Sequence, residues 1–308
     1  MATSINDQTS ASPFHAGERA IHASLGIESQ VEELGRRMIR DHLTDQHRHF
    51  YQSLPYLVMG SSDRHGQPVA SLLTGEPGFI SSPTAQSMTI TAKPVAGDAL
   101  DDNLRPGSPI GLLGIDFSTR RRNRANGRVT ETGRADGGFS LQIDQAFGNC
   151  PAYIKKRDME VLSQHLATTQ RGEPVTGEQL TPADRLLIEA AETFFIATHY
   201  SGDTVQLGNG TDVSHRGGDP GFVEVTNNTT LLIPDYAGNQ HFNTLGNLRE
   251  NPRTGLLFIN FETGDYLQLA GAIEIIWTGN EISRFAGAER LLRFRLDNTT
   301  RISPIETA

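Results

Sequence analysis

Gly111-Leu-Leu-Gly-Ile-Asp-Phe117 returns about 144 residues later as Gly255-Leu-Leu-Phe-Ile-Asn-Phe261. Both stretches are short apolar runs of the kind that forms buried strands. Four further pairs of matching segments keep the same order, with offsets that drift only between about 137 and 144 residues: Leu43-Thr44 with Leu180-Thr181, Gly75–Phe79 with Gly218–Phe222, Asn103–Arg105 with Asn247–Arg249, and Asn126-Gly127 with Ala270-Gly271. Ordered matches at a nearly constant spacing indicate a duplicated domain, because solenoid repeats have much shorter periods.

The composition is that of an ordinary globular protein, with 36% hydrophobic and 20% charged residues among 308. A net charge of −9 argues against nucleic-acid partners, since such binding depends on neutralising phosphates. The single cysteine, Cys150, excludes an internal disulfide and a cysteine-built zinc site, which is typical of a reducing compartment. Without an apolar N-terminal core or a run of about 18 apolar residues, we expect a cytoplasmic protein that does not contact a membrane.

Each copy predicts about six short strands separated by turns and preceded by a helix. Such a pattern favours a small antiparallel barrel, which leaves no free sheet edges. The expected fold class is therefore mainly β with flanking helices (α+β), with two tandem barrels packed as an internal pseudodimer. The expected divisions are an N-terminal arm and helix over 1–42, a first barrel over 43–154, a linker over 155–180, a second barrel over 181–280 and a C-terminal tail over 281–308. Residues 1–13 are expected to be a disordered arm, and Glu289–Leu296 a short amphipathic element packed on the body.

The second copy resembles the pyridoxamine 5′-phosphate oxidase-like, FMN-binding split-barrel proteins. The resemblance rests on segments in a fixed order: Gly221-Phe-Val223, Leu232–Tyr236, Thr244–Leu248, Asn251–Phe258 and Gln268–Gly271. It implies two split barrels, FMN held in a cleft between them, and redox chemistry at the isoalloxazine ring. It also implies a small-molecule substrate or an electron donor, such as a nicotinamide cofactor or a reductase, and a homodimer. Ser214–Gly218 stands where the vitamin-salvage oxidases carry Arg-x-x-Leu-Leu-Lys, which argues against pyridoxamine phosphate as substrate.

A hydroxyl, an imidazole, a guanidinium and a flexible N–H group occur within four consecutive residues: Ser214, His215, Arg216 and Gly217. A phosphate needs convergent donors, and the arginine fork can hold two oxygens at once. The same place in the first copy reads Ser71–Gly75 and lacks the charged groups, so these are a feature of one copy rather than a demand of the fold. The alternative is a solvated turn with incidental charge.

Two further groups of residues complete the candidate FMN site. The resemblance places flavin contacts on the segment after Leu231–Pro234, where amide and hydroxyl groups could meet the ribityl chain or the ring; the alternative there is ordinary turn chemistry. On a strand, Arg120, Arg122 and Arg124 would share one face. They could hold the flavin phosphate across the seam between copies or an anionic substrate; the alternative is that they only protect a sheet edge. The candidates in the two groups are Asp235, Tyr236, Asn239, Thr244, Leu245, Asn247, Gln268, Arg122 and Arg124, with Gln268 matching Arg124.

No side chain presents itself as a catalytic acid or base, so the catalytic residues are left open. His15, Glu18 and His22 share a helical face, but without further ligands they do not predict a metal site. Cys150 and Trp277 are expected to be buried. The function that follows is an FMN-dependent oxidoreductase; the alternatives are a non-catalytic flavin- or haem-binding carrier and an interaction protein whose pocket has decayed.

Overall fold

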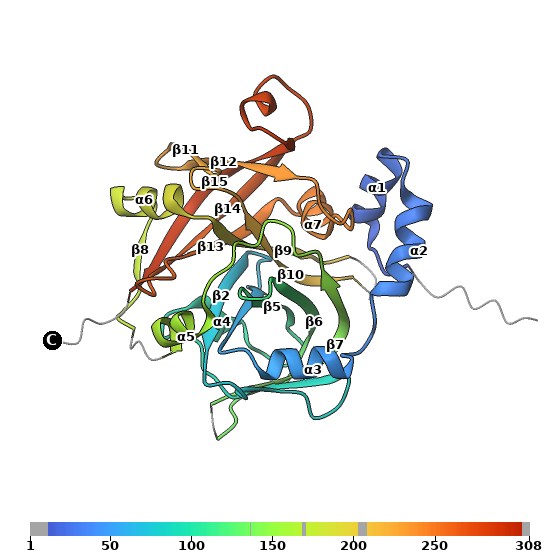
Figure 1. The fold of residues 1–308 in the computed structure, drawn as a ribbon, viewed down its shortest axis with the longest axis vertical. Helices are drawn as coiled ribbons and strands as arrows, with labels where there is room; N and C mark the ends of the chain where they lie inside the picture. The colour runs from blue at the N-terminus through green and yellow to red at the C-terminus, as the bar shows by residue number, and fades with distance from the viewer. Residues whose placement is uncertain (1–11, 136, 168–170, 203–207, 304–308) are drawn as a thin grey trace, which may run out of the picture.

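A computed structural model describes residues 12–135, 137–167, 171–202 and 208–303 (Figure 1). The first half of the chain forms a seven-stranded antiparallel sheet of order β2-β1-β5-β6-β7-β4-β3. Its strands are β1 (Tyr56–Ser62), β2 (Pro68–Thr74), β3 (Ile80–Ser81), β4 (Ser87–Ile90), β5 (Pro109–Asp116), β6 (Arg121–Glu131) and β7 (Phe139–Asn149).

The second half repeats this sheet in the order β10-β9-β13-β14-β15-β12-β11, with β8 paired to the far end of β15. Its strands are β8 (Val175–Gly177), β9 (Thr193–Tyr200), β10 (Gly210–Gly217), β11 (Glu224–Asn227), β12 (Thr230–Tyr236), β13 (Arg253–Ile259), β14 (Tyr266–Ile276) and β15 (Ala288–Ile302). Apart from β8, the two orders correspond strand for strand. The fold is two tandem split barrels, which confirms the expected class and the duplication.

The strand registers show which residues of the two repeats are equivalent. Leu113 pairs with Arg124 between β5 and β6, and Leu257 pairs with Gln268 between β13 and β14. Because β5 and β13 also pair with their neighbours β1 and β9 in matching register, Arg124 and Gln268 occupy equivalent positions. The short helices α4 (Ala99–Asn103) and α7 (Asn243–Glu250) precede these strand pairs in the same way.

Four apolar clusters form the interior of the described residues. One lies in the first repeat, and two lie in the second, the larger of which also takes in Ile21. The fourth joins strands of both repeats, including Val58 and Leu113 from the first and Phe195 and Leu257 from the second. The glycines of the repeated motif explain how closely the barrels meet. A Cβ at Gly111 would lie 2.5 Å from the Thr211 carbonyl oxygen of the second repeat, and one at Gly255 would lie 2.6 Å from the Pro68 carbonyl oxygen of the first.

The helices lie around the barrels. Helices α3 (Asp45–Gln52) and α6 (Pro182–Ala190) open the two repeats, and each begins at a threonine cap, Thr44 and Thr181. Helices α1 (Ala16–Ser24) and α2 (Glu28–Met38) form an N-terminal hairpin beside α7, and η1 (Ile282–Arg284) interrupts the β14–β15 connection (Figure 1). Within the described residues, no helix is both long and apolar enough to span a membrane.

Several local expectations were wrong. Glu289–Leu296 belongs to β15, which pairs with β12 and β14 inside the second sheet instead of forming a tail element. The region expected as a linker contains α5 (Met159–Ala167) and β8. Trp277 is 40% exposed because it follows the end of β14 in a projecting connection. The expected arm over 1–13 falls mostly outside the described residues.

Candidate functional site

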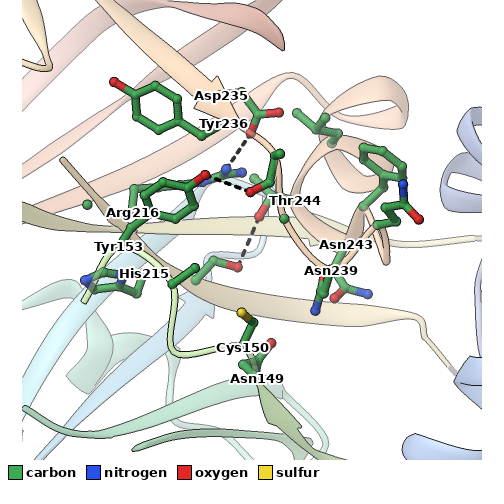
Figure 2. Close-up of a pocket in the computed structure, with 18 of the residues that line it drawn as sticks. Asn149, Cys150, Tyr153, His215, Arg216, Asp235, Tyr236, Asn239, Asn243 and Thr244 are labelled. Atoms are coloured by element: carbon green, nitrogen blue, oxygen red, sulfur yellow. Dashed lines mark hydrogen bonds and ion pairs between the residues drawn. The ribbon is translucent and has the colours of Figure 1, made fainter. Parts of the chain in front are cut away.

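A cleft of about 460 Å³ lies where the two repeats meet (Figure 2). Strand β10 and the end of β12 contribute the second-repeat wall, together with the 237–242 loop and the start of α7. Strand β6 and residues Asn149–Tyr153 contribute the first-repeat wall, and Leu25 and Ile27 reach in from the N-terminal hairpin. The volume and the mixed lining fall in the range of sites for small molecules and cofactors.

Arg124 joins the two repeats inside this cleft. Its Nη1 donates to Asp212 Oδ1 at 3.1 Å and to Asn243 Oδ1 at 3.0 Å, and its Nη2 donates to Ser214 Oγ. Thr244 Oγ1 donates to the same serine oxygen at 3.1 Å. The guanidinium of the first repeat is thus held by three side chains of the second, and only 4% of the residue is exposed.

A second pair of arginines lies against Asp235. Arg216 Nη1 donates to Asp235 Oδ1, and Arg290 Nε lies 3.6 Å from Asp235 Oδ2. The Arg290 guanidinium stacks over the rings of Phe242, at 5.2 Å, and Trp277, at 5.4 Å. Asp235 and Arg216 lie on the side of the cleft opposite Cys150 in Figure 2. Asp235 contacts both guanidiniums, and Arg290 Nη2 also donates to Glu289.

His215 faces away from Ser214 and Arg216 along β10 and lies beside Arg122. Arg122 Nη1 lies 3.2 Å from His215 Nδ1, and Thr193 Oγ1 lies 3.3 Å from Nε2. Burial, and then the positive charges of Arg122, Arg216 and Arg157, hold the pKa of His215 well below its usual range. The imidazole is therefore neutral and accepts a hydrogen bond from the arginine. Burial lowers the pKa of Arg122 to about 10, which leaves it charged at neutral pH.

The cleft retains hydrogen-bond donors that no described residue accepts. Helix α7 begins at Asn243. The residue before it, Phe242, is left-handed with φ 57° and its side chain cannot cap the helix, so no side chain satisfies the first N–H groups of α7. The unpartnered side-chain donors in the lining are Arg122 Nε, Arg124 Nε, Arg216 Nε, Arg290 Nη1 and Asn149 Nδ2. Buried donors are normally satisfied, and a helix N-terminus attracts negative charge, so the arrangement suits an anionic ligand.

Eleven of the thirteen candidate residues from the sequence line this one cleft. They are Arg122, Arg124, Ser214, His215, Arg216, Gly217, Asp235, Tyr236, Asn239, Thr244 and Leu245.

The two exceptions are buried amides that are not part of the lining. Asn247 Nδ2 donates to Thr198 Oγ1 at 2.9 Å and Asp212 Oδ2 at 2.8 Å. Gln268 Nε2 donates across the seam to Ser71 Oγ at 3.1 Å and Asp98 Oδ2 at 3.0 Å. Both amides therefore donate to other side chains of the protein, whereas we expected them to contact the cofactor.

Three details of the sequence interpretation need correction or addition. Cys150 is exposed and lines the cleft instead of being buried, because it lies just beyond β7. Arg120 does not share the strand face of its neighbours, since it precedes β6 with a positive φ of 60°. The sequence analysis did not identify Arg290 and Asn243 as site residues, although both line the cleft. The available signal for Arg290 was its place in a segment of alternating polar and apolar residues, and for Asn243 its place directly before Thr244.

Comparison with known proteins identifies the second repeat. Residues 180–298 match the sequence profile of a family described as pyridoxamine 5′-phosphate oxidase. This match lies in the second half of the chain. A search of curated proteins finds no match.

Solved structures similar to the chain cover about half of it. One is HupZ from Group A Streptococcus, with 14% identity and a TM-score of 0.31, covering 42% of this chain and 96% of that one. A putative pyridoxamine 5′-phosphate oxidase from Lactobacillus delbrueckii has 11% identity and a TM-score of 0.33, covering 42% and 98%. An FMN-binding protein from Syntrophomonas wolfei has 11% identity and a TM-score of 0.28, covering 40% and 83%.

Proposed function

We propose that this protein binds FMN in the cleft between its repeats and acts as an oxidoreductase. The observation that carries the proposal is the set of unpartnered arginine donors beside the uncapped start of α7. An anion with several acceptor oxygens is the ligand that such a set can satisfy. The match of residues 180–298 to the pyridoxamine 5′-phosphate oxidase family supports the choice of a flavin nucleotide.

The residues that would hold the phosphate are Arg124, Ser214 and Thr244, with the first N–H groups of α7. Their positions are already fixed by hydrogen bonds to each other, so little ordering is needed when an anion binds. Arg216, Arg122 and Tyr236 line the remaining cleft and would contact the less charged part of the nucleotide. Positive charge there would stabilise negative charge that develops on a bound ring system.

FMN would supply the hydride or electron transfer, and the chain would supply binding, orientation and electrostatics. His215 is neutral and has partners on both ring nitrogens, which makes it a positioning residue for Arg122 and not a proton donor. The electron donor that we propose is a nicotinamide cofactor or a reductase, and the substrate is a small molecule.

The direct test is to purify the protein and record its visible absorption spectrum, then identify the released small molecule by mass spectrometry. A flavin spectrum and the mass of FMN are expected. Colourless protein that takes up no added FMN would overturn the proposal, and a Soret band would replace it with haem binding. Reduction of the bound flavin by NADH or NADPH, followed at the flavin absorption maximum, then tests the oxidoreductase step.

A further inference from the structure

The N-terminal hairpin makes an unusually close contact with the helix that begins at the cleft. A Cβ at Gly17 of α1 would lie 2.3 Å from the Gly246 carbonyl oxygen of α7, and one at Gly246 would lie 2.4 Å from Glu18 Cγ. Both positions therefore need glycine, and α1 is held directly on α7. Leu25 and Ile27, which follow α1, line the cleft.

A continuous series of hydrogen bonds runs from this contact to the cleft. Glu18 Oε2 accepts from the His15 backbone N–H at 2.8 Å, and Glu18 Oε1 accepts from Asn243 Nδ2. Asn243 Oδ1 in turn accepts from Arg124 Nη1 at 3.0 Å. Because an amide has one donor side and one acceptor side, the bond to Glu18 fixes which face of Asn243 meets Arg124.

We propose that α1 is a working part of the ligand site, and that the buried Glu18 carboxyl, through Asn243, sets the orientation and the effective charge of Arg124. This inference rests on the proposed function for its ligand, FMN. It gives Glu18 the role of a positioning residue, since it lies outside the cleft lining.

The charge of Glu18 decides how strongly Arg124 can attract an anion. Burial, and then the negative charge of Asp212, raise the pKa of Glu18 to about 8. At neutral pH the carboxyl is therefore neutral and leaves Arg124 with Asp212 as its one ion-pair partner. Above pH 8 a second carboxylate would lie near Arg124, and the cleft would become less favourable for a phosphate.

Other titratable and charged groups face Glu18 from each element packed around it. Burial is the main cause that lowers the pKa of the three imidazoles, to about 4 for His15 and His241 and below the usual value for His22. All three imidazoles are therefore neutral between pH 7 and 9, whereas Glu18 changes charge there. The groups are His15 before α1, His22 on α1, His241 before α7, Glu250 on α7, Asp212 on β10 and Arg124 on β6.

The test compares Glu18→Gln, which cannot ionise, with the parent chain. In the parent chain the FMN dissociation constant should rise about three- to tenfold from pH 7 to pH 9, measured by quenching of flavin fluorescence. In Glu18→Gln it should stay constant over that range. Glu33→Gln removes one exposed carboxylate from α2 and should behave like the parent chain.

A second variant and a ligand-free measurement keep the outcome decisive. Glu18→Ala removes the acceptor for Asn243 and should weaken FMN binding about tenfold at pH 7. Without FMN, the Arg124 Nε–H resonance, assigned by its loss in Arg124→Lys, should shift with a midpoint near pH 8 in the parent chain and not in Glu18→Gln. An unshifted resonance, or equal pH dependence in both chains, overturns the inference. Failure of the parent chain to bind FMN would instead overturn the proposed function, and the resonance would still test the role of Glu18.

Discussion

The two repeats place equivalent residues around two equivalent positions, yet only one of them is arranged for a ligand. In the second position, Arg124, Ser214 and the start of α7 surround a cleft with free donors. In the first, Gln268 replaces Arg124, and its amide bonds to Ser71 and Asp98. The protein's own side chains have taken the place of a ligand there.

The difference is clearest at the two helix starts. Asp98 caps α4, because its carboxylate accepts from the Leu100 N–H at 2.9 Å and from Ser71 Oγ at 2.7 Å. Phe242 has the equivalent place before α7 and offers no such acceptor. A carboxylate at one helix start excludes an anion, and an uncapped helix start invites one. The comparison therefore predicts one FMN per chain.

The largest expected effect comes from giving the second position the residue of the first. Arg124→Gln should weaken FMN binding by more than about 100-fold, because it removes a charge-assisted contact and leaves Asp212 without its cation. Fluorescence titration of the folded variant measures the loss. Gln268→Met, the matched change at the first position, should leave FMN affinity unchanged. Retention of affinity within about threefold in Arg124→Gln, or a titration end point of two FMN per chain, would break the comparison.

The next-largest expected effect is on the free energy of unfolding, and it comes from the buried carboxyl of Asp98. Burial raises its pKa from 3.8 to about 6, so the folded chain holds a proton that the unfolded chain releases. The stabilisation from this proton is complete below pH 3.8 and is lost as pH rises through 6. Between pH 4 and 7 the parent chain should lose roughly 2 kcal/mol of unfolding free energy relative to Asp98→Asn.

Urea unfolding of both chains at several pH values measures this difference, and the other titrating groups contribute equally to both. Asp102→Asn, an exposed change in the same helix, should follow the parent chain. If the unfolding free energies of Asp98→Asn and the parent chain change with pH in parallel, the pKa of Asp98 is not raised by folding. The first position would then hold a negative charge at neutral pH without a loss of stability.

Thr244 offers a smaller change at the second position. Thr244→Val keeps the side-chain shape and removes the hydroxyl that donates to Ser214. A neutral hydrogen bond contributes about 1 kcal/mol, so FMN affinity should fall roughly five- to tenfold. Thr226→Val on the exposed β11 is the control and should bind FMN as the parent chain does. Unchanged affinity in Thr244→Val would remove this hydroxyl from the phosphate site and leave the backbone of α7 as the feature that matters.

The sequence predicts the barrels well, because apolar strands and close-packed glycines recur in both copies. It fails at β15, where charged residues alternate along a strand whose two neighbours lie elsewhere in the chain. The candidate site was likewise predicted only in part, because the sequence does not show which distant segments meet. Arg216 was found because one copy carries it and the other does not, and Thr244 because the family resemblance places flavin contacts on its segment.

Residues with internal partners could not be separated from residues that face a ligand. Gln268 and Asn247 are polar positions next to the right motifs, but their partners are Asp98 and Asp212, which only the folded chain brings near. Arg290 was missed for the converse reason, since its place in the cleft depends on Asp235 and two aromatic rings from separate segments. Side-chain burial likewise depends on position in the fold, as exposed Cys150 shows.

The smallest expected effect lies at the rim of the cleft, where the first repeat covers the second. Tyr153 stacks on Tyr236, with ring centroids 5.3 Å apart, and its hydroxyl donates to the Ala237 carbonyl at 3.0 Å. Tyr153→Phe keeps the stacking and loses one exposed hydrogen bond, so FMN affinity should change less than about threefold. Tyr153→Ala also removes the ring and should raise the FMN dissociation rate more than Tyr153→Phe does, measured by stopped-flow fluorescence. Equal rates in the two variants would show that the second position retains its ligand through Arg124 and α7 alone, with no contribution from the covering segment of the first repeat.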